Sequence, residues 1–299
     1  NNGGSATSTT INSGHQLVSS GGSATGTIIN GGFQNVNGGT VSGTIISSGI
    51  QNVHSGTAKD TTISGGTQFV YRSAEDTLIH SGGNQTVRFH NGSGGIATNT
   101  TIQSGGIQQV SSGATATNTI ISAGGQQNVY LGGTANNLNV YGTQTVYGTT
   151  SGSMIMDGGK QTVHSGGTAT NGSIQSGGTQ TVSSGATAVS ATINNEGWQY
   201  VYNGGSAAGT TIHGGGTQEL SGSATGTTIS GGKQDVSGGS AISTIIHAGG
   251  EQNVRLGGKA IHTTISGGRQ DINIGGTATS STINNFGDQK VYGGGTATD

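Results

Sequence analysis

Residues 166–184 read Gly166-Gly167-Thr168-Ala169-Thr170-Asn171-Gly172-Ser173-Ile174-Gln175-Ser176-Gly177-Gly178-Thr179-Gln180-Thr181-Val182-Ser183-Ser184. Two short runs, one ending at Ile174 and one at Val182, alternate apolar and polar side chains as strands do. Each run is flanked by a Gly pair or by Ser-Gly, and glycine supplies the positive φ that tight corners need. With a third short stretch around Ala169, the pattern predicts three short strands joined by three corners.

The tripeptide Gln-x-Val recurs along the whole chain, with Leu or Ile in place of Val in a few copies. The sixteen copies begin at Gln16, Gln34, Gln51, Gln68, Gln85, Gln108, Gln127, Gln144, Gln161, Gln180, Gln199, Gln218, Gln234, Gln252, Gln270 and Gln289. A short, persistent period indicates a solenoid in which each repeat is one coil. We therefore expect an all-β fold, a single-stranded parallel β-helix (β-solenoid) of about 16 coils of about 18–19 residues, over residues 1–299.

Period-two alternation also predicts which side chains point inward. These are the Val of each tripeptide, the small Ala, and an Ile that follows the Thr run, at Ile29, Ile63, Ile102, Ile193, Ile229 and Ile265. Gln lies two residues before Val, so it shares the inward face or its margin. Because a buried amide is costly unless it is hydrogen-bonded, we expect the Gln amides to bond from coil to coil.

Two irregularities interrupt the period. The 23-residue gap between Gln85 and Gln108 predicts an outward loop around residues 89–92, Phe-His-Asn-Gly. Around residues 139–142 the coil is shortened, and Met154-Ile155-Met156 replaces the usual Thr-x-Ile. These positions predict a bend or a local change in cross-section.

The composition excludes several classes of protein. With 63 Gly, no Pro and 28% hydrophobic residues, a large compact core is not expected, yet the regular phase of β-branched residues argues against a disordered linker. Only 7% of residues are charged and the net charge is −2, so the basic stripe of a nucleic-acid binder is missing. The absence of Cys excludes disulfides and thiolate metal sites. The chain begins and ends in mid-repeat, which suggests a segment of a longer protein.

The position directly after Val is a column of side chains in adjacent coils. It contains two groups of large residues, His54-Tyr71-Arg88 and Tyr130-Tyr147-His164. Exposed aromatic and Arg side chains are typical of contact surfaces, although aromatic residues also stack along ordinary sheets. Trp198, Tyr200 and Tyr202 alternate along one predicted strand and form a small aromatic platform for a sugar or a second solenoid.

The C-terminal coils carry alternating charges. The position before Gln holds Lys233, Glu251, Arg269 and Asp288, and the neighbouring column holds Glu219, Asp235, Asn253, Asp271 and Lys290. Oppositely charged neighbours in adjacent coils stabilise an exposed sheet by only a few tenths of a kcal/mol each. The ladder therefore sets the register or, alternatively, complements a second solenoid.

We expect neither a catalytic site nor a metal or cofactor. Glu219 and Asp235 resemble the paired carboxylates of glycosidases, but catalysis needs a cleft and two carboxyl groups in different environments, and these two lie on a flat face beside Lys233. The eight His are scattered and lack the spacing of metal ligands.

Ser residues recur at two predicted corners of the coil. They follow Val or precede the Gly pair after Ile, at Ser19, Ser20, Ser55, Ser64, Ser81, Ser104, Ser111, Ser112, Ser165, Ser176, Ser183, Ser184, Ser221, Ser230, Ser237 and Ser266. Such an array of hydroxyls either carries sugars at regular intervals or is a solvated β-surface.

The motif Gly-Gly-Thr-Ala-Thr-x-x-x-Ile-x-Ser-Gly-Gly-x-Gln-x-Val at residues 166–182, approximated in most coils, resembles the passenger repeat of self-associating autotransporter adhesins. These form the AIDA, antigen-forty-three and TibA group of Gram-negative bacteria, and the Ser-rich coils are most similar to the TibA and AIDA repeats. The resemblance implies a right-handed β-helix on the extracellular side of the outer membrane, exported through its own C-terminal β-barrel. It also implies autoaggregation, biofilm formation, adhesion to host epithelial cells, and heptose attached to the Ser hydroxyls by a cytoplasmic heptosyltransferase.

The sequence thus favours a non-enzymatic adhesin that contacts copies of itself on neighbouring cells. The candidate contact residues are Tyr71, Arg88, Tyr130, Tyr147, His164, Trp198, Tyr200, Tyr202, Lys233, Glu251, Arg269 and Asp288. Two alternatives remain, a carbohydrate-active β-helix enzyme and a passive spacer that presents another domain.

Overall fold

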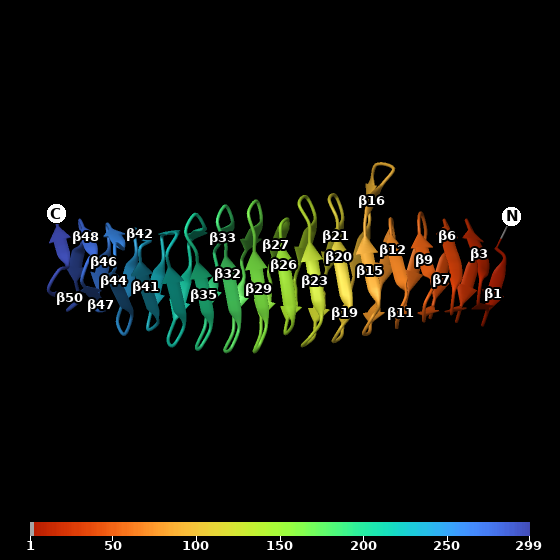
Figure 1. Ribbon diagram of the computed structural model, residues 1–299, viewed down its shortest axis with the longest axis horizontal. Coiled ribbons are helices and arrows are strands. Elements are labelled where there is room, and N and C mark those ends of the chain that lie inside the picture. Colours follow the sequence, from red (N-terminus) through yellow and green to blue (C-terminus); the bar gives the residue numbers. More distant parts are fainter. Residues whose placement is uncertain (1–2) are drawn as a thin grey trace. The chain divides into compact units, whose positions relative to one another are not determined.

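The computed structural model describes residues 3–299, in which every regular element is a β-strand. The chain divides into two compact units, Asn1–Thr150 and Ser151–Asp299. In each unit, successive coils stack their strands in parallel, as the predicted β-solenoid requires (Figure 1). Each coil contributes one strand to each of three sheets, here called A, B and C in chain order. Residues 3–299 contain no helix long and apolar enough to cross a membrane.

The first unit contains eight coils, in which equivalent strands pair with their neighbours. Its sheet A consists of β1 (Ser5–Thr7), β4 (Ser23–Thr25), β7 (Thr40–Ser42), β10 (Thr57–Lys59), β13 (Ser73–Glu75), β18 (Ile96–Thr98), β21 (Thr115–Thr117) and β24 (Thr134–Asn136). Its sheet B consists of β2 (Thr10–Ile11), β5 (Ile28–Ile29), β8 (Ile45–Ile46), β11 (Thr62–Ile63), β14 (Leu78–Ile79), β19 (Thr101–Ile102), β22 (Ile120–Ile121) and β25 (Asn139–Val140). Its sheet C consists of β3 (Gly14–Ser19), β6 (Gly32–Asn37), β9 (Ile50–Val53), β12 (Thr67–Val70), β15 (Asn84–Val87), β20 (Ile107–Val110), β23 (Gln126–Val129) and β26 (Thr143–Val146).

The second unit repeats this arrangement, and β27 (Thr149–Ser151) spans the boundary between the units. Its sheet A consists of β30 (Thr168–Thr170), β33 (Thr187–Val189), β36 (Ser206–Ala208), β39 (Ser223–Thr225), β42 (Ser240–Ile242), β45 (Lys259–Ile261), β48 (Thr277–Thr279) and β51 (Thr296–Thr298). Its sheet B consists of β28 (Met154–Ile155), β31 (Ser173–Ile174), β34 (Thr192–Ile193), β37 (Thr211–His213), β40 (Thr228–Ser230), β43 (Ile245–His247), β46 (Thr264–Ser266) and β49 (Thr282–Asn284). Its sheet C consists of β29 (Lys160–Val163), β32 (Thr179–Val182), β35 (Trp198–Val201), β38 (Thr217–Leu220), β41 (Lys233–Ser237), β44 (Glu251–Arg255), β47 (Arg269–Ile272) and β50 (Asp288–Val291).

The register is the one that the repeat predicts. Strand β23 pairs with β26 so that Gln127 faces Gln144 and Val129 faces Val146. Residues 17 positions apart are therefore lateral neighbours, and each kind of side chain forms a column through the coils of a unit.

Three apolar columns fill the interior of each unit, one from each sheet. Sheet A contributes mainly Ala, sheet B mainly Ile and sheet C mainly Val, and the six predicted Ile are all fully buried. Small Ala on one side and larger Ile and Val on the other two let three strands approach closely around a narrow core. The predicted inward positions are confirmed except in the last coil, where Val291 is 50% exposed.

The Gln side chains form a buried hydrogen-bonded ladder beside the Val column. In the first unit each Nε2 donates to the Oε1 of the Gln in the preceding coil, from Gln34 to Gln144, at 2.6–2.8 Å. The second unit repeats the pattern from Gln180 to Gln289, at 2.6–2.7 Å. Buried Thr hydroxyls of the B side also bond to the ladder, as Thr119 does to the Oε1 of Gln108. The amides are thus satisfied without water, as predicted, whereas the Thr contribution was not foreseen.

Two of the three corners are turns in which glycine usually supplies the positive φ, although Glu196 and Phe286 take that position in two coils. At the corner between sheets C and A, the Ala114 amide donates to the Ser111 carbonyl at 3.0 Å and Gly113 has a φ of +72°. At the corner between sheets B and C, the Gly106 amide donates to the Gln103 carbonyl at 2.9 Å and Gly105 has a φ of +74°. A positive φ at the third turn residue is what a type II turn demands.

The corner between sheets A and B differs from the sequence interpretation, which assigned all positive φ values to glycine. Here a single left-handed residue turns the chain, and in many coils it is polar, such as Asn99, Asn118, Asn137 and Asn171 with φ of 52–56°. Asn tolerates this conformation because its short amide bonds locally. The Asn118 Nδ2 donates to the Asn99 Oδ1 in the preceding coil at 3.2 Å.

Both irregular regions alter corners rather than sheets. Residues 89–94 form a hairpin, β16 (Phe89–His90) and β17 (Ser93–Gly94), that projects from the first unit as predicted (Figure 1). At the shortened coil, the amides of Tyr141 and Gly142 both donate to the Ile121 carbonyl, so a two-residue corner replaces the longer turn. In the Met-rich stretch Ile155 still occupies the buried position.

Candidate contact surfaces

A cluster of rings lies on the first unit below the projecting hairpin. The His54 and Tyr71 rings, from adjacent coils, stack with centroids 4.9 Å apart and planes 6° apart. His90 of β16 lies against both, 5.2 Å from Tyr71 and 6.2 Å from His54. Burial, and secondarily the charge of His90, lower the pKa of His54 below its ordinary value of 6.5. We call His54, Tyr71 and His90 the ring cluster.

The column of residues after Val predicts that Arg88 extends the His54–Tyr71 row. In the structure Arg88 does not extend it. Its guanidinium carbon lies 4.4 Å from the ring centroid of Phe69, in the preceding coil. A cation over an aromatic face is attracted by the ring quadrupole, which explains the choice of partner. The column of residues after Val contains neither Phe69 nor His90, because Phe69 lies inside the Gln-x-Val tripeptide and His90 lies on the hairpin.

The second predicted group is divided between the units. Tyr130 and Tyr147, in adjacent coils of the first unit, are 41% and 39% exposed. His164 belongs to the second unit and is partly buried. The two Tyr rings therefore offer apolar surface with hydroxyl groups to solvent, which suits a contact surface.

Strand β35 presents the predicted aromatic platform on the second unit. Trp198 and Tyr200 stack at 5.9 Å, and Tyr200 and Tyr202 stack at 6.4 Å, with planes 13° and 15° apart. Trp198 is 37% and Tyr202 is 52% exposed. Burial, followed by the charge of Glu219, raises the pKa of Tyr200 above its ordinary value. The three rings form one continuous outward-facing row.

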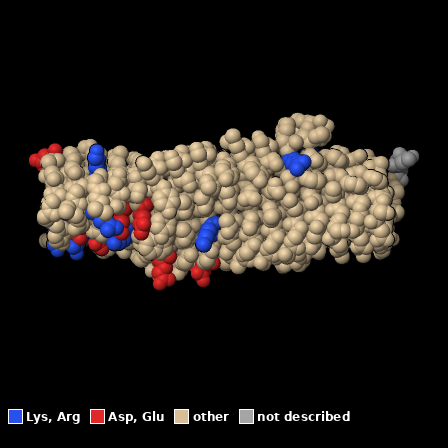
Figure 2. Space-filling view, viewed as in Figure 1, with Lys and Arg blue, Asp and Glu red and all other residues tan. Residues whose placement is uncertain are grey.

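Charged side chains of the second unit gather over its C-terminal coils, as Figure 2 shows. The predicted register Lys233–Glu251–Arg269–Asp288 is present. The ion pairs, however, form within strands and not between coils, between Lys233 and Asp235, Arg269 and Asp271, and Lys290 and Asp288. Among residues 3–299, no ion pair includes Glu251. The expected ladder of pairs between coils is therefore wrong.

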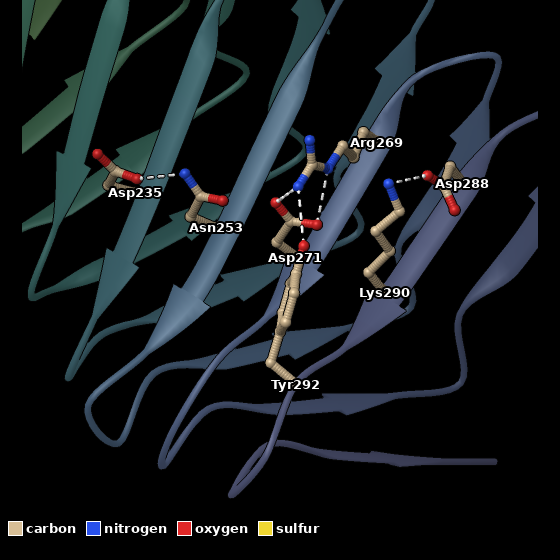
Figure 3. A network of polar contacts seen from close by, with 7 residues as sticks. All are labelled: Asp235, Asn253, Arg269, Asp271, Asp288, Lys290 and Tyr292. Carbon is tan, nitrogen blue, oxygen red and sulfur yellow. Dashed lines mark hydrogen bonds and ion pairs between the residues drawn. The ribbon is translucent and has the colours of Figure 1, made fainter.

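Two of the carboxylates in this region are nearly buried. Asp271 is 4% exposed and is held by Arg269, which also donates to the Tyr292 hydroxyl at 3.1 Å (Figure 3). Asp235 is 8% exposed and accepts from Asn253 in the next coil at 3.0 Å. Hydrogen bonding to Asp271 is the main cause that raises the pKa of Arg269. A hollow of about 470 Å³ lies over these groups, flanked by exposed Leu256 and Ile274.

The two carboxylates that resemble a glycosidase pair lie in adjacent coils, but one of them is held in an ion pair. Glu219 and Asp235 face each other in register, and Asp235 is bound by Lys233 at 3.0 Å. The hollow beside Asp235 does not include Glu219. Residues 3–299 also contain no group of three or more His, Asp or Glu side chains placed to hold a metal ion.

The predicted sugar acceptors all reach the surface. Twelve of the sixteen Ser are exposed, and Ser111, Ser183, Ser237 and Ser266 are partly buried. Seven share one position, the second residue of a turn whose third residue is a positive-φ Gly, and all seven are exposed: Ser20, Ser81, Ser104, Ser112, Ser165, Ser176 and Ser184. At this position the side chain projects from the corner between two sheets.

No protein-family profile matches the chain. No curated protein sequence matches it either. Among solved structures, it is similar to the crystal structure of the TibC-catalyzed hyper-glycosylated TibA55-350 fragment, with a TM-score of 0.75 and 36% sequence identity. The similarity covers 99% of this chain and 100% of that one. Fold and repeat thus define a β-solenoid passenger. The chain belongs to the family of AIDA- and TibA-like autotransporter adhesin passengers.

Proposed function

We propose that this chain is a bacterial surface adhesin, displayed on the extracellular side of the outer membrane, that joins cells to one another and to host epithelial cells. The similarity to TibA along 99% of the chain is the observation that carries the proposal. Cell aggregation of this kind underlies biofilm growth. The chain acts by binding and not by catalysis.

The adhesive contacts are weak and repeated. The aromatic platform of Trp198, Tyr200 and Tyr202 and the Tyr130–Tyr147 face supply apolar area with polar edges, as interfaces do. The C-terminal charges add electrostatic complementarity to a second copy. Many copies on two facing cells raise the effective concentration, so contacts of low individual affinity hold the cells together.

Heptose attached by a cytoplasmic heptosyltransferase is the second part of the proposal. The similar TibA fragment is glycosylated by TibC, and the seven turn Ser described above are exposed hydroxyls at recurring corners. Each sugar projects from a corner and leaves the flat sheet faces free for contact. The remaining nine candidate Ser lie at or next to the same corners, and four of them, Ser19, Ser230, Ser237 and Ser266, are the last residue of a strand.

A settling assay of cells that display the chain tests the adhesive surface. The variant Trp198→Ser/Tyr200→Ser/Tyr202→Ser is expected to slow settling several-fold. Phe33→Ser, which removes an exposed ring stacked on His15 outside the proposed surfaces, is the matched control and should settle normally. Equal settling of both variants and the parent would favour the passive spacer.

Mass spectrometry with and without a co-expressed heptosyltransferase tests the glycan. Ser112→Ala and Ser184→Ala should each lower the mass of the modified chain by one heptose, whereas Ser153→Ala, at a buried position, should not. An identical mass with and without the enzyme would remove the glycoprotein claim and leave the adhesive proposal intact.

A further inference from the structure

The hairpin β16–β17 covers one side of a cleft on the first unit. The cleft has a volume of about 800 Å³. Asn37, His54, Ser55 and Arg72, from the corners of three successive coils, line it from the solenoid. His90 and Asn91 line it from the hairpin. This volume lies within the range of pockets that hold small ligands.

The hairpin is built to hold its position. Asn91 and Gly92 both have positive φ, 49° and 78°, as a two-residue type I′ turn requires. The Gly95 amide donates to the Arg88 carbonyl at 2.8 Å and closes its base. Phe89 packs on Gly113 of the following coil, where an added Cβ would lie only 2.8 Å from the Phe89 ring. The hairpin is thus fixed to the coil behind it while His90 faces the coils before it.

The cleft is lined by cationic and ionisable basic groups and by no carboxylate. Arg72 is exposed and permanently charged, and two imidazoles line the same cleft. The three carboxylates within residues 3–150 have partners elsewhere: Glu75 binds Lys59 at 2.9 Å, Asp76 accepts from Asn99 at 3.0 Å, and Asp60 accepts from Ser42 at 3.1 Å. An anionic group entering the cleft therefore meets a guanidinium without competition from a protein carboxylate.

The remaining lining groups match the hydroxyls of a sugar. Asn37, Ser55, Asn91 and Ser93 provide amides and hydroxyls that both donate and accept hydrogen bonds. Tyr71 covers one face of the His54 ring. The coil on the other side carries the smaller Asn37 at the equivalent position, so this ring face adjoins the cleft. A flat ring beside hydroxyl-binding groups is suited to the apolar face of a pyranose.

We propose that this cleft binds an acidic saccharide, with the sugar carboxylate on Arg72 and the pyranose ring against His54. The ligand class is a carboxylate-bearing sugar, either a sialic acid or a uronic acid. The site uses the free hydroxyl of Ser55, so it requires that this candidate acceptor carries no heptose. It does not depend on heptose at the seven turn Ser.

The test is a titration of the whole 299-residue chain, followed by saturation-transfer NMR and calorimetry. The probes are 3′-sialyllactose and digalacturonate, with lactose as the neutral control. At least one acidic sugar is expected to bind, and lactose at least tenfold more weakly. The two acidic probes separate the two sources of the carboxylate.

Variants connect binding to the cleft. Arg72→Gln should weaken the acidic sugar at least tenfold, whereas Arg255→Gln, an exposed Arg of the second unit, should leave it unchanged. A second variant replaces the hairpin, residues 89–94, with a short corner like that at residues 111–114, and should also lose binding while retaining the β-sheet circular dichroism.

Several outcomes overturn the proposal. These are failure of both acidic sugars to bind, lactose binding as tightly as sialyllactose, or full affinity in Arg72→Gln. Equal affinity for inorganic sulfate would show a simple anion site and would equally reject the saccharide. Settling of cells without added sugar is measured separately. A failure of the proposed adhesion can therefore be distinguished from a failure of sugar binding in this cleft.

Discussion

Arg269 donates its Nε hydrogen bond to the Oδ1 of Asp271, two residues along the same strand, at 2.7 Å. Its neighbours in the adjacent coils, Glu251 and Asp288, are also acidic but are not its partners. Asp271 is nearly buried, so its charge gains more from a guanidinium than an exposed carboxylate does. The ion pairs in this region therefore form within single strands, β41, β47 and β50, and it is the Gln ladder that links one coil to the next.

Removing Arg269 should destabilise the C-terminal coils. Arg269→Gln leaves Asp271 nearly buried without its cation, which costs on the order of 2 kcal/mol. Lys290→Gln breaks a pair in which both side chains are about half exposed, and should cost less than about 0.5 kcal/mol. Urea unfolding followed by circular dichroism measures both. Equal midpoints for the two variants would show that burial of Asp271 has no energetic consequence.

A carboxylate in the Gln ladder should disrupt the stacking. In Gln127→Glu, a carboxylate oxygen replaces the donating Nε2 and faces the Oε1 of Gln108, so the hydrogen bond is lost and a charge is buried. The free energy of unfolding should fall by about 3 kcal/mol at neutral pH. Lowering the pH protonates the new carboxyl and should restore much of the stability. Gln126→Glu, exposed on the same strand, is the control and should remain near the parent. A midpoint for Gln127→Glu equal to that of the control would contradict the ladder.

The left-handed corner should discriminate between side chains by shape. Asn118 has a φ of 55°, which a β-branched residue adopts at a cost of about 1–2 kcal/mol. Asn118→Val is therefore expected to lower the unfolding midpoint, whereas Asn118→Gly should be close to neutral because glycine adopts this φ freely. The same urea titration compares them, and a Gly variant less stable than the Val variant would argue against backbone strain at this corner.

His54 should make the first unit less stable in mild acid. Its folded pKa is below 6.5, so the unfolded chain takes up a proton first as the pH falls. The stability that the neutral His54 ring contributes is fully present above pH 6.5 and is lost as the pH falls from there towards the folded pKa. His54→Gln should therefore lose less stability than the parent between pH 7.5 and pH 5.5.

The control for His54 is His213→Gln, at an exposed position of the second unit. This variant should keep the pH dependence of the parent, because no comparable burial surrounds the ring. The unfolding midpoint at the two pH values is the measurement. An unchanged pH dependence in His54→Gln would show that the ring cluster does not contribute to acid sensitivity.

The coil and its interior could be predicted from the sequence because they depend only on the position of each residue within the repeat. Gln127 and Val129 recur one coil later as Gln144 and Val146, and period-two alternation then decides which side chains are buried. The outward loop around residues 89–92 followed from the 23-residue gap between Gln85 and Gln108, whereas its pairing as a hairpin came only from the structure. The exposed Ser and the Trp198–Tyr202 row followed from the same periodicity, and their roles remain proposals.

The partners of the long side chains were decided by the tertiary structure. A column places Arg88 after Tyr71 and Arg269 between two acids, yet Arg88 covers Phe69 and Arg269 binds Asp271. Each side chain has several neighbours within reach, and the choice depends on ring orientation and on how deeply each partner is buried. Periodicity specifies which residues are neighbours, but only the three-dimensional arrangement gives ring orientation and depth of burial. The cleft that His90 and Arg72 both line is likewise seen only in the tertiary structure.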